Sequence, residues 1–159
     1  MRFMEKEDVI NHLRAAKAAH IKWVQKAKLL INGLDIEEDA IPIDSTECKF
    51  GKWFYSDGQI LNSLANNPAE AMGSIENLHF RLHDVYLQIF NIYFNKAKKL
   101  GFFSKIFGLK RKQVTDLESK VAFEHYHSME QISKELLEEI NRLERRLIAV
   151  SEDKIRTLM

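Results

Sequence analysis

Residues 132–147 read ISKELLEEINRLERRL, and this stretch decides the fold class. Its apolar residues recur every three or four positions, which places them along one face of a helix. Several of the other positions hold glutamate and arginine residues at spacings of three and four, where each pair stabilises a helix by only about 0.2–0.5 kcal/mol. The same period predicts one helix over 113–150 with this apolar face: Val114, Leu117, Val121, Ile132, Leu136, Ile140, Leu143 and Leu147.

Two further stretches carry the helical period. Residues 5–32 are expected to form the first helix, which ends at Asn32-Gly33, a common C-terminal signal. A second long helix is expected from Pro68 to about 99, with the proline in its first turn. A connector and two short helices are expected between them: 33–44, 46–55 and 58–66. The sequence therefore predicts an all-α, four-helix-type bundle with a short helical segment carrying the only cysteine.

The composition agrees with one helical domain. The chain has 159 residues with 6 glycines and 2 prolines, and long helices tolerate few of either. We expect a single domain over 1–159, with its core at about 5–150. The net charge of +1 argues against a general nucleic-acid binder. The charged N-terminus does not resemble a signal peptide, and no stretch is apolar for about 20 residues, so we expect a cytoplasmic protein.

The histidines and the cysteine form a candidate metal site. His79 and His83 are four residues apart, which places both imidazoles on one helix face. His20 lies on the inward face of the first helix. Cys48 is expected just inside the helix 46–55, capped by a residue of 44–46, where the helix N-terminus lowers a cysteine pKa. Two alternatives stay open: the histidines bond to carboxylates or solvent, and Cys48 is a small buried apolar residue.

Three imidazoles and one thiolate suit zinc, which is borderline-soft and accepts tetrahedral ligand sets. Such a set would leave no coordination position for water, which argues against a hydrolytic zinc enzyme. A metal-dependent enzyme stays an alternative if Cys48 is not a ligand. We expect no catalytic residues.

Three separated motifs resemble those of the chemoreceptor zinc-binding (CZB) domain family. Residues Cys48–Phe54 (CKFGKWF) resemble the signature in which a cysteine precedes a glycine and a tryptophan. His20–Trp23 (HIKW) is similar to the first histidine motif, and Leu78–His83 (LHFRLH) to the paired one. The resemblance extends over about 8–149. One departure is Phe54, where leucine or tyrosine is more usual.

This resemblance implies that His20, Cys48, His79 and His83 are zinc ligands in a helical homodimer. It implies zinc sensing in some members and redox sensing through the cysteine, for example by hypochlorous acid, in others. Members usually carry the domain beside a chemoreceptor signalling region or a cyclic-di-GMP-synthesising domain. Neither is seen in this sequence, so we expect a sensory module that acts on a separate chemoreceptor or diguanylate cyclase. A zinc-stapled dimer that serves as an interaction module is the alternative.

Several neighbours of the candidate ligands have expected roles. Gly51 would let another helix approach the site. Trp23 and Trp53 would wall the metal off from water or simply form core. A ligating histidine usually donates its second N–H to a carboxylate or a carbonyl. The candidate carboxylates close to the ligands in sequence are those of Glu47, Glu76 and Asp84.

Residues 96–112 read KAKKLGFFSKIFGLKRK, with seven basic residues and no acid. Such a segment can lie on an anionic membrane surface or dock on a partner. We favour an interhelical loop whose aromatic side chains pack on the end of the bundle.

Overall fold

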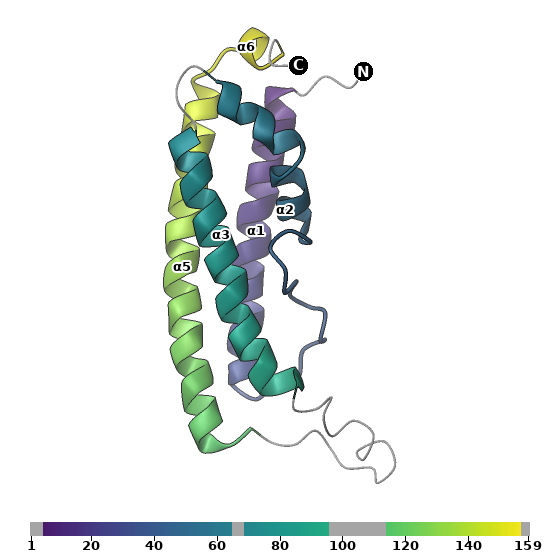
Figure 1. Ribbon diagram of the computed structural model, residues 1–159, viewed down its shortest axis with the longest axis vertical. Helices are drawn as coiled ribbons and strands as arrows, with labels where there is room; N and C mark the ends of the chain where they lie inside the picture. The colour runs from purple at the N-terminus through teal and green to yellow at the C-terminus, as the bar shows by residue number, and fades with distance from the viewer. Residues whose placement is uncertain (1–4, 65–68, 96–113, 157–159) are drawn as a thin grey trace.

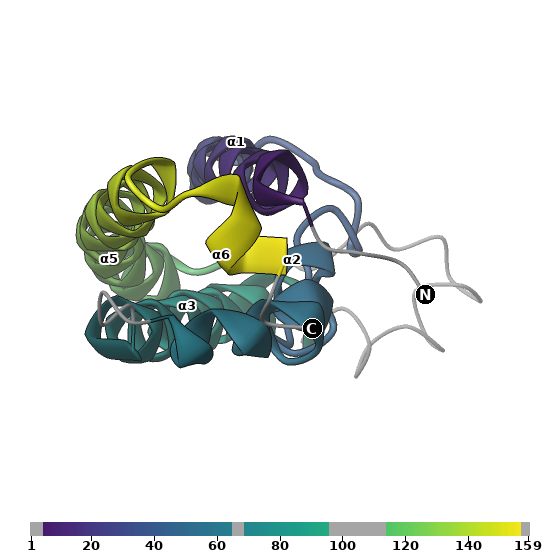
Figure 2. The same cartoon turned by 90° about the horizontal axis from the view of Figure 1, so that it is seen from above.

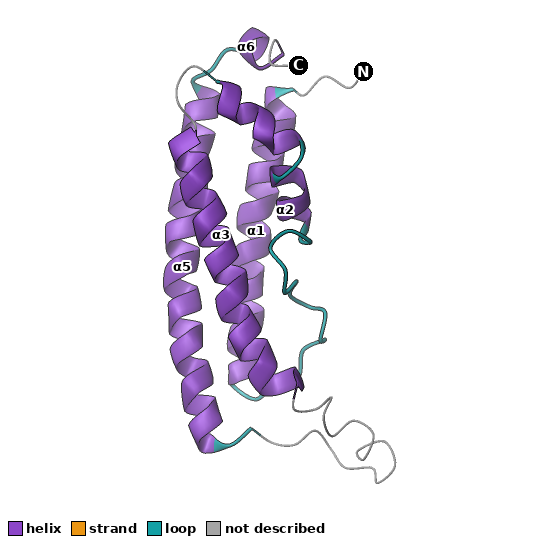
Figure 3. Ribbon diagram, viewed as in Figure 1, coloured by secondary structure: helices purple, strands orange, loops and turns teal. Residues whose placement is uncertain are grey.

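The computed structural model describes residues 5–64, 69–95 and 114–156, and these residues form helices and loops with no strand (Figure 3). The elements in chain order are α1 (Lys6–Ile31), α2 (Lys49–Phe54), the 3-10 helix η1 (Asp57–Ser63), α3 (Ala69–Phe90), the π-helical turn η2 (Asn91–Asn95), α5 (Asp116–Ile148) and α6 (Glu152–Arg156). The all-α prediction is confirmed. None of the helices in the described ranges is long and apolar enough to cross a membrane.

The helix α5 packs along both other long helices, α1 and α3 (Figure 1). Seen from above, α2 lies on the side away from α5, near both α1 and α3 (Figure 2). Because α2 has only six residues, the irregular connector that precedes it continues this fourth side of the bundle (Figure 1). The short helix α6 lies over one end. The bundle therefore has three full-length sides and one built from a short helix and a loop.

Local signals set the ends of the long helices. Gly33 follows the last turn of α1 with a φ of 85°, and its N–H donates to the Leu30 carbonyl at 3.0 Å. Glycine adopts this left-handed conformation without steric cost, so the predicted end of the first helix is confirmed. At the start of α5, the Thr115 hydroxyl accepts from the Glu118 N–H while the Glu118 carboxylate accepts from the Thr115 N–H. This capping box starts α5 at Asp116 and not at 113.

The predicted apolar faces are buried along most of their length. The buried members of the α5 face are Ile132, Leu136, Ile140, Leu143 and Leu147, and α3 buries a face of the same helical period, Met72, Ile75, Leu78, Leu82 and Ile89. Two members of the α5 face do not follow the prediction: the exposed fractions of Leu117 and Val121 are 73% and 37%. Both residues lie in the first two turns of α5, where Ser119 and Phe123, and not these two, line a pocket with Ile31 and Tyr93.

The short segments differ from their predictions in detail. The helix expected over 46–55 is shorter, at Lys49–Phe54, and the one expected over 58–66 is the 3-10 helix Asp57–Ser63. The basic segment 96–112 lies outside the described residues.

Candidate metal centre

Four residues from three separate segments meet between α1, α2 and α3. His20 comes from α1, His79 and His83 from α3, and Cys48 immediately precedes α2. Their exposed fractions are 0%, 2%, 3% and 1%, respectively. We call these four residues the His3Cys cluster. The structure brings together all four residues that the sequence singled out.

The three imidazoles of the His3Cys cluster face one another, and the Cys48 sulfur approaches one of them, His79. The Nε2 atom of His79 lies 3.1 Å from Nε2 of His83 and 3.3 Å from the sulfur of Cys48. The three histidines offer ligand atoms that all lie within 4.8 Å of one another. Tetrahedral zinc, with bonds of about 2.0–2.1 Å to nitrogen and 2.3 Å to sulfur, separates two nitrogens by about 3.3 Å and a nitrogen from a sulfur by about 3.6 Å. The observed separations are close to these values.

Backbone carbonyls fix the tautomers of two rings. The Nδ1 atom of His20 lies 2.5 Å from the Ala16 carbonyl, and that of His83 lies 2.7 Å from the Pro42 carbonyl. A carbonyl only accepts hydrogen bonds, so each Nδ1 carries the proton and each Nε2 of the neutral ring carries a lone pair. Carbonyls are common outer partners of metal-bound histidines because they hold the ring in the binding tautomer.

One of these lone pairs has no partner in the structure. The Nε2 atom of His20 is buried and makes no hydrogen bond. An unsatisfied buried polar atom costs about 1–3 kcal/mol, so such atoms call for a specific explanation. A cation shared by His20, His79 and His83 would satisfy the orphaned nitrogen of His20. The donor set therefore fits zinc.

Burial keeps the imidazoles neutral. It lowers the pKa of His20 to about 4 and that of His79 to about 2, and the neighbouring imidazoles lower the pKa of His79 further. Burial also lowers the pKa of His83, although the hydrogen bond to Pro42 acts in the opposite direction. At neutral pH all three rings can therefore offer a lone pair without first losing a proton.

Cys48 differs from its prediction in two ways. It is the N-cap of α2 and not a residue inside the helix: its sulfur accepts from the Gly51 N–H at 3.2 Å. The pKa of its thiol is raised, because burial outweighs the opposing hydrogen bonds from the Gly51 and Phe50 N–H groups. The predicted lowering by the helix N-terminus is thus wrong for this buried position.

The loop before Cys48 explains Gly51. A Cβ atom on Gly51 would collide with the Ser45 carbonyl, so the close approach that glycine permits is that of the preceding loop and not of another helix. Asp44, one of the expected caps, instead holds this loop: its carboxylate accepts from the N–H and the hydroxyl of Thr46, both at 2.8 Å. The loop and the glycine together position the Cys48 sulfur.

Aromatic rings cover one side of the His3Cys cluster. The Trp23 ring lies edge-on to His20 with a centroid distance of 4.5 Å, and Phe50 lies 5.0 Å from His79. Trp53 lies one layer further out, where it stacks on His12 at 4.9 Å. Trp23 thus covers the His3Cys cluster as predicted, whereas Phe50 and not Trp53 covers it from α2.

The three acids proposed as outer partners of the ligands are placed elsewhere. Glu47 pairs with Lys52 at 3.5 Å, and Glu76 accepts from the Tyr55 hydroxyl at 3.2 Å. Asp84 is exposed on α3. Backbone carbonyls take the role that sequence reasoning assigned to carboxylates, and no side-chain pattern could have revealed them.

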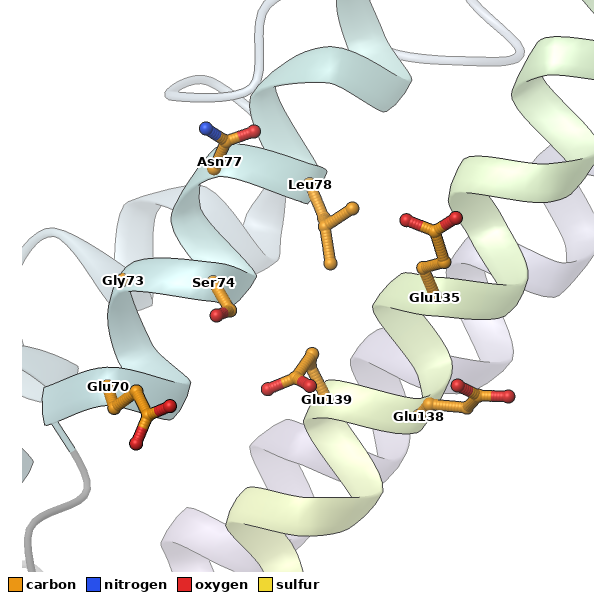
Figure 4. Close-up of a pocket in the computed structure, with 8 residues that line it drawn as sticks. All are labelled: Glu70, Gly73, Ser74, Asn77, Leu78, Glu135, Glu138 and Glu139. Carbon is orange, nitrogen blue, oxygen red and sulfur yellow. The ribbon is translucent and has the colours of Figure 1, made fainter.

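A groove of different chemistry lies between α3 and α5. This acidic groove has a volume of about 590 Å³ and is lined by Glu70, Gly73, Ser74, Asn77, Leu78, Glu135, Glu138 and Glu139. Figure 4 shows Leu78 pointing from α3 toward α5, with Glu139 between the two helices. Arg142 pairs with Glu139 at 3.4 Å and with Glu70 at 3.9 Å. No imidazole or thiol lines the acidic groove, so its donors suit zinc less well than those of the His3Cys cluster.

Comparison with known proteins supports the same location. Residues 20–90 match the model of the chemoreceptor zinc-binding domain, and this range contains the whole His3Cys cluster. No curated protein and no solved structure matches the chain.

Proposed function

We propose that this chain, whose residues 20–90 match the model of the chemoreceptor zinc-binding domain, is a zinc-binding sensory module whose ion is held by the His3Cys cluster. The observation that carries the proposal is the convergence of imidazole nitrogens on one buried point, where Nε2 of His20 has no other partner. Because the pKa of Cys48 is raised, its thiol keeps its proton at neutral pH. A cation that binds the sulfur must displace this proton, as for any thiol ligand.

The proposed centre is not catalytic. Four protein donors complete a tetrahedral zinc site, whereas a hydrolytic zinc enzyme keeps one position for water. The near-complete burial of all four donors supports this, because a substrate would have to displace packed side chains to reach them.

Two inputs are compatible with such a centre. Zinc availability could act through stability, because the donors from three segments are assembled only in the folded chain. An oxidant could act through Cys48, the most oxidisable donor. With hypochlorous acid, the net reaction converts the thiolate to a sulfenic acid and releases chloride, so that sulfur loses two electrons and becomes a poorer ligand. The short segment that carries Cys48 would then be free to move.

We propose that the module acts in the cytoplasm on a separate bacterial signalling protein of the chemoreceptor or diguanylate cyclase type, in chemotaxis or cyclic-di-GMP signalling. We also propose that it forms a homodimer. The exposed apolar side chains of Leu117 and Val121 at the free end of α5 support a contact with another chain.

Zinc release during oxidation tests the sensory proposal. The zinc-loaded protein is titrated with hypochlorous acid in the presence of a chromogenic zinc chelator. We expect about one zinc ion per chain to be released by the first equivalents of oxidant, and to be rebound after treatment with a thiol reductant. A Met72→Leu/Met129→Leu variant is the matched control, because it removes two other oxidisable sulfurs and should respond like the wild type.

Retention of zinc under these conditions would instead favour the zinc-stapled interaction module. The burial of the His3Cys cluster supports that alternative, because a cross-link between three segments stabilises the bundle whether or not it responds to an oxidant.

A further inference from the structure

Two cavities lined by described residues flank the His3Cys cluster, and they differ in the charge of their lining. The smaller, of about 70 Å³, lies between α1 and α2 and is lined by His12, Ala15, Ala16, Ala19, Trp23, Lys49 and Phe50. The larger, of about 210 Å³, lies between the connector and α3 and is lined by Ile43, Asp44, Ser45, Phe80, His83, Asp84 and Leu87. We call the larger one the Asp44/Asp84 cavity.

Only the Asp44/Asp84 cavity is lined by a member of the His3Cys cluster. His83 is one of its lining residues, its Nδ1 bonds to the Pro42 carbonyl of the connector, and its Nε2 lies 3.1 Å from that of His79. The lining of the smaller cavity includes Trp23 and Phe50, whose rings pack against the imidazole of His20. A cation in the Asp44/Asp84 cavity would therefore lie beside a residue of the His3Cys cluster, whereas one in the smaller cavity would be separated from the cluster by aromatic residues.

The charges at the two cavities favour the same side. Asp44 on the connector and Asp84 on α3 place two exposed carboxylates at the larger cavity. The hydrogen bonds from Thr46 hold the Asp44 carboxylate in place. The ionisable residues at the smaller cavity are His12 and Lys49, and the ammonium group of Lys49 repels cations. Clefts lined by charge of one sign concentrate ions of the opposite sign and accelerate their binding.

We propose that a divalent cation reaches the His3Cys cluster through the Asp44/Asp84 cavity, drawn by the two carboxylates, and that His83 is the first ligand it meets. This inference rests on the proposed zinc site and adds its route of access. The two carboxylates set the rate of metal uptake, and the His3Cys cluster retains the ion once bound.

Stopped-flow mixing of metal-free protein with zinc chloride tests the route. The fluorescence of Trp23 reports zinc binding, because its ring contacts His20 and His83. In the Asp44→Asn/Asp84→Asn variant, the asparagine at 44 can still accept from Thr46. We expect the association rate constant to fall about tenfold at low ionic strength and much less at high salt, where the attraction is screened. The rate of zinc loss to a chelator should change by no more than about twofold, because the route alters approach and leaves the ligands intact.

The controls separate local charge from net charge. The Glu135→Gln/Glu138→Gln variant removes the same charge from the acidic groove between α3 and α5, and it should take up zinc at the wild-type rate (Figure 4). The Lys49→Ala variant at the smaller cavity should also leave the rate unchanged.

Several results would overturn the route while leaving the zinc site intact. One is an unchanged association rate constant in the Asp44→Asn/Asp84→Asn variant, and another is equal slowing in both double variants. Slowing that high salt does not reduce, or faster zinc uptake by Lys49→Ala, would also exclude the route. Failure of the wild type to bind zinc would instead overturn the proposed function itself.

Discussion

Two clusters of polar side chains among the described residues differ in whether their buried polar atoms all have partners. Between α1 and α5, the Glu144 carboxylate accepts from Arg14 at 2.8 Å and from Lys17 at 2.6 Å, and Lys17 also donates to Asn141 at 2.8 Å. We call these four residues the Glu144 network. In the His3Cys cluster, by contrast, two imidazole nitrogens face each other and a third has no partner.

The Glu144 network and the His3Cys cluster also differ in the charge of their side chains. Hydrogen bonds from Lys17 and Arg14 lower the pKa of Glu144, so this carboxylate is held ionised. Burial lowers the pKa values of the histidines in the His3Cys cluster, so these rings are held neutral. A network that satisfies its own charges stabilises the fold without a ligand, whereas a buried lone pair without a donor, beside two further imidazoles, suits a ligand from outside. The comparison therefore favours the His3Cys cluster over the Glu144 network as the proposed metal site.

The largest expected effect is that of zinc on stability. With free zinc at about 1,000 times the dissociation constant, the free energy of unfolding should rise by about 4 kcal/mol, which is about 10 °C in the melting temperature of a chain of this length. The His20→Ala, Cys48→Ala and His83→Ala variants should lose most of this shift, and a Glu144→Gln variant should keep it. Calorimetry with and without a chelator measures both. An equal shift in every variant would mean that zinc binds elsewhere.

Acid should destabilise the metal-free protein through the His3Cys cluster. Below pH 6.5 the unfolded chain protonates its histidines, whereas folded His20 stays neutral down to about pH 4, so stability falls as the pH falls through this window. The difference of roughly 2.5 pKa units corresponds to about 3 kcal/mol for this one residue. Urea unfolding at a series of pH values measures the loss.

A His20→Leu variant is the control for the acid effect. It removes both the titrating ring and its unsatisfied nitrogen, so it should lose less stability than the wild type between pH 6.5 and 4. An identical pH profile in the two proteins would show that His20 is not protected from protonation in the folded state.

Breaking the Glu144 network should cost stability without changing metal binding. Glu144→Ala removes the shared acceptor of Arg14 and Lys17, and should lower the free energy of unfolding by about 2 kcal/mol. The cost is moderate because 60% of the Arg14 side chain and 23% of the Lys17 side chain are already exposed. Zinc affinity, measured by chelator competition, should stay at the wild-type value. A coupled loss of affinity would show that the two clusters are not independent.

The smallest expected effect is a proton released on zinc binding. The pKa of Cys48 is raised, so the thiol is protonated at neutral pH and must lose one proton to become a ligand. Since the histidines are already neutral there, the association constant should rise about tenfold per pH unit between pH 6.5 and 8, a change of about 1.4 kcal/mol per unit. In Cys48→Ala, any residual binding should be nearly independent of pH. A rise close to a hundredfold per pH unit in the wild type would mean that a second ligand also loses a proton on binding.

The sequence predicted the parts of the fold that depend on side-chain periodicity. Ile132, Leu136 and Ile140 recur at helical spacing and are buried as expected. The four donors could be named because their residue types and order resemble a family motif. The spacing of His79 and His83 alone would not have excluded two solvated histidines.

The details that the sequence did not reveal depend on the path of the backbone. The carbonyls that orient His20 and His83 belong to Ala16 and Pro42, and every residue type carries a carbonyl, so no pattern identifies them. The collision that excludes a side chain at Gly51 involves a backbone atom of the preceding loop for the same reason. The exposure of Leu117 depends on which side of α5 the neighbouring helices cover at its start, and the period of one helix does not encode this.

X-ray absorption at the zinc edge, on protein loaded with one equivalent of zinc, shows whether the His3Cys cluster holds the ion. We expect three nitrogens at about 2.0–2.1 Å and one sulfur at about 2.3 Å around the zinc, with the sulfur contribution lost in Cys48→Ala. Nitrogen and oxygen ligands alone in the wild type would contradict this expectation, because Cys48 would then be a core residue and the His3Cys cluster would not be a closed metal centre.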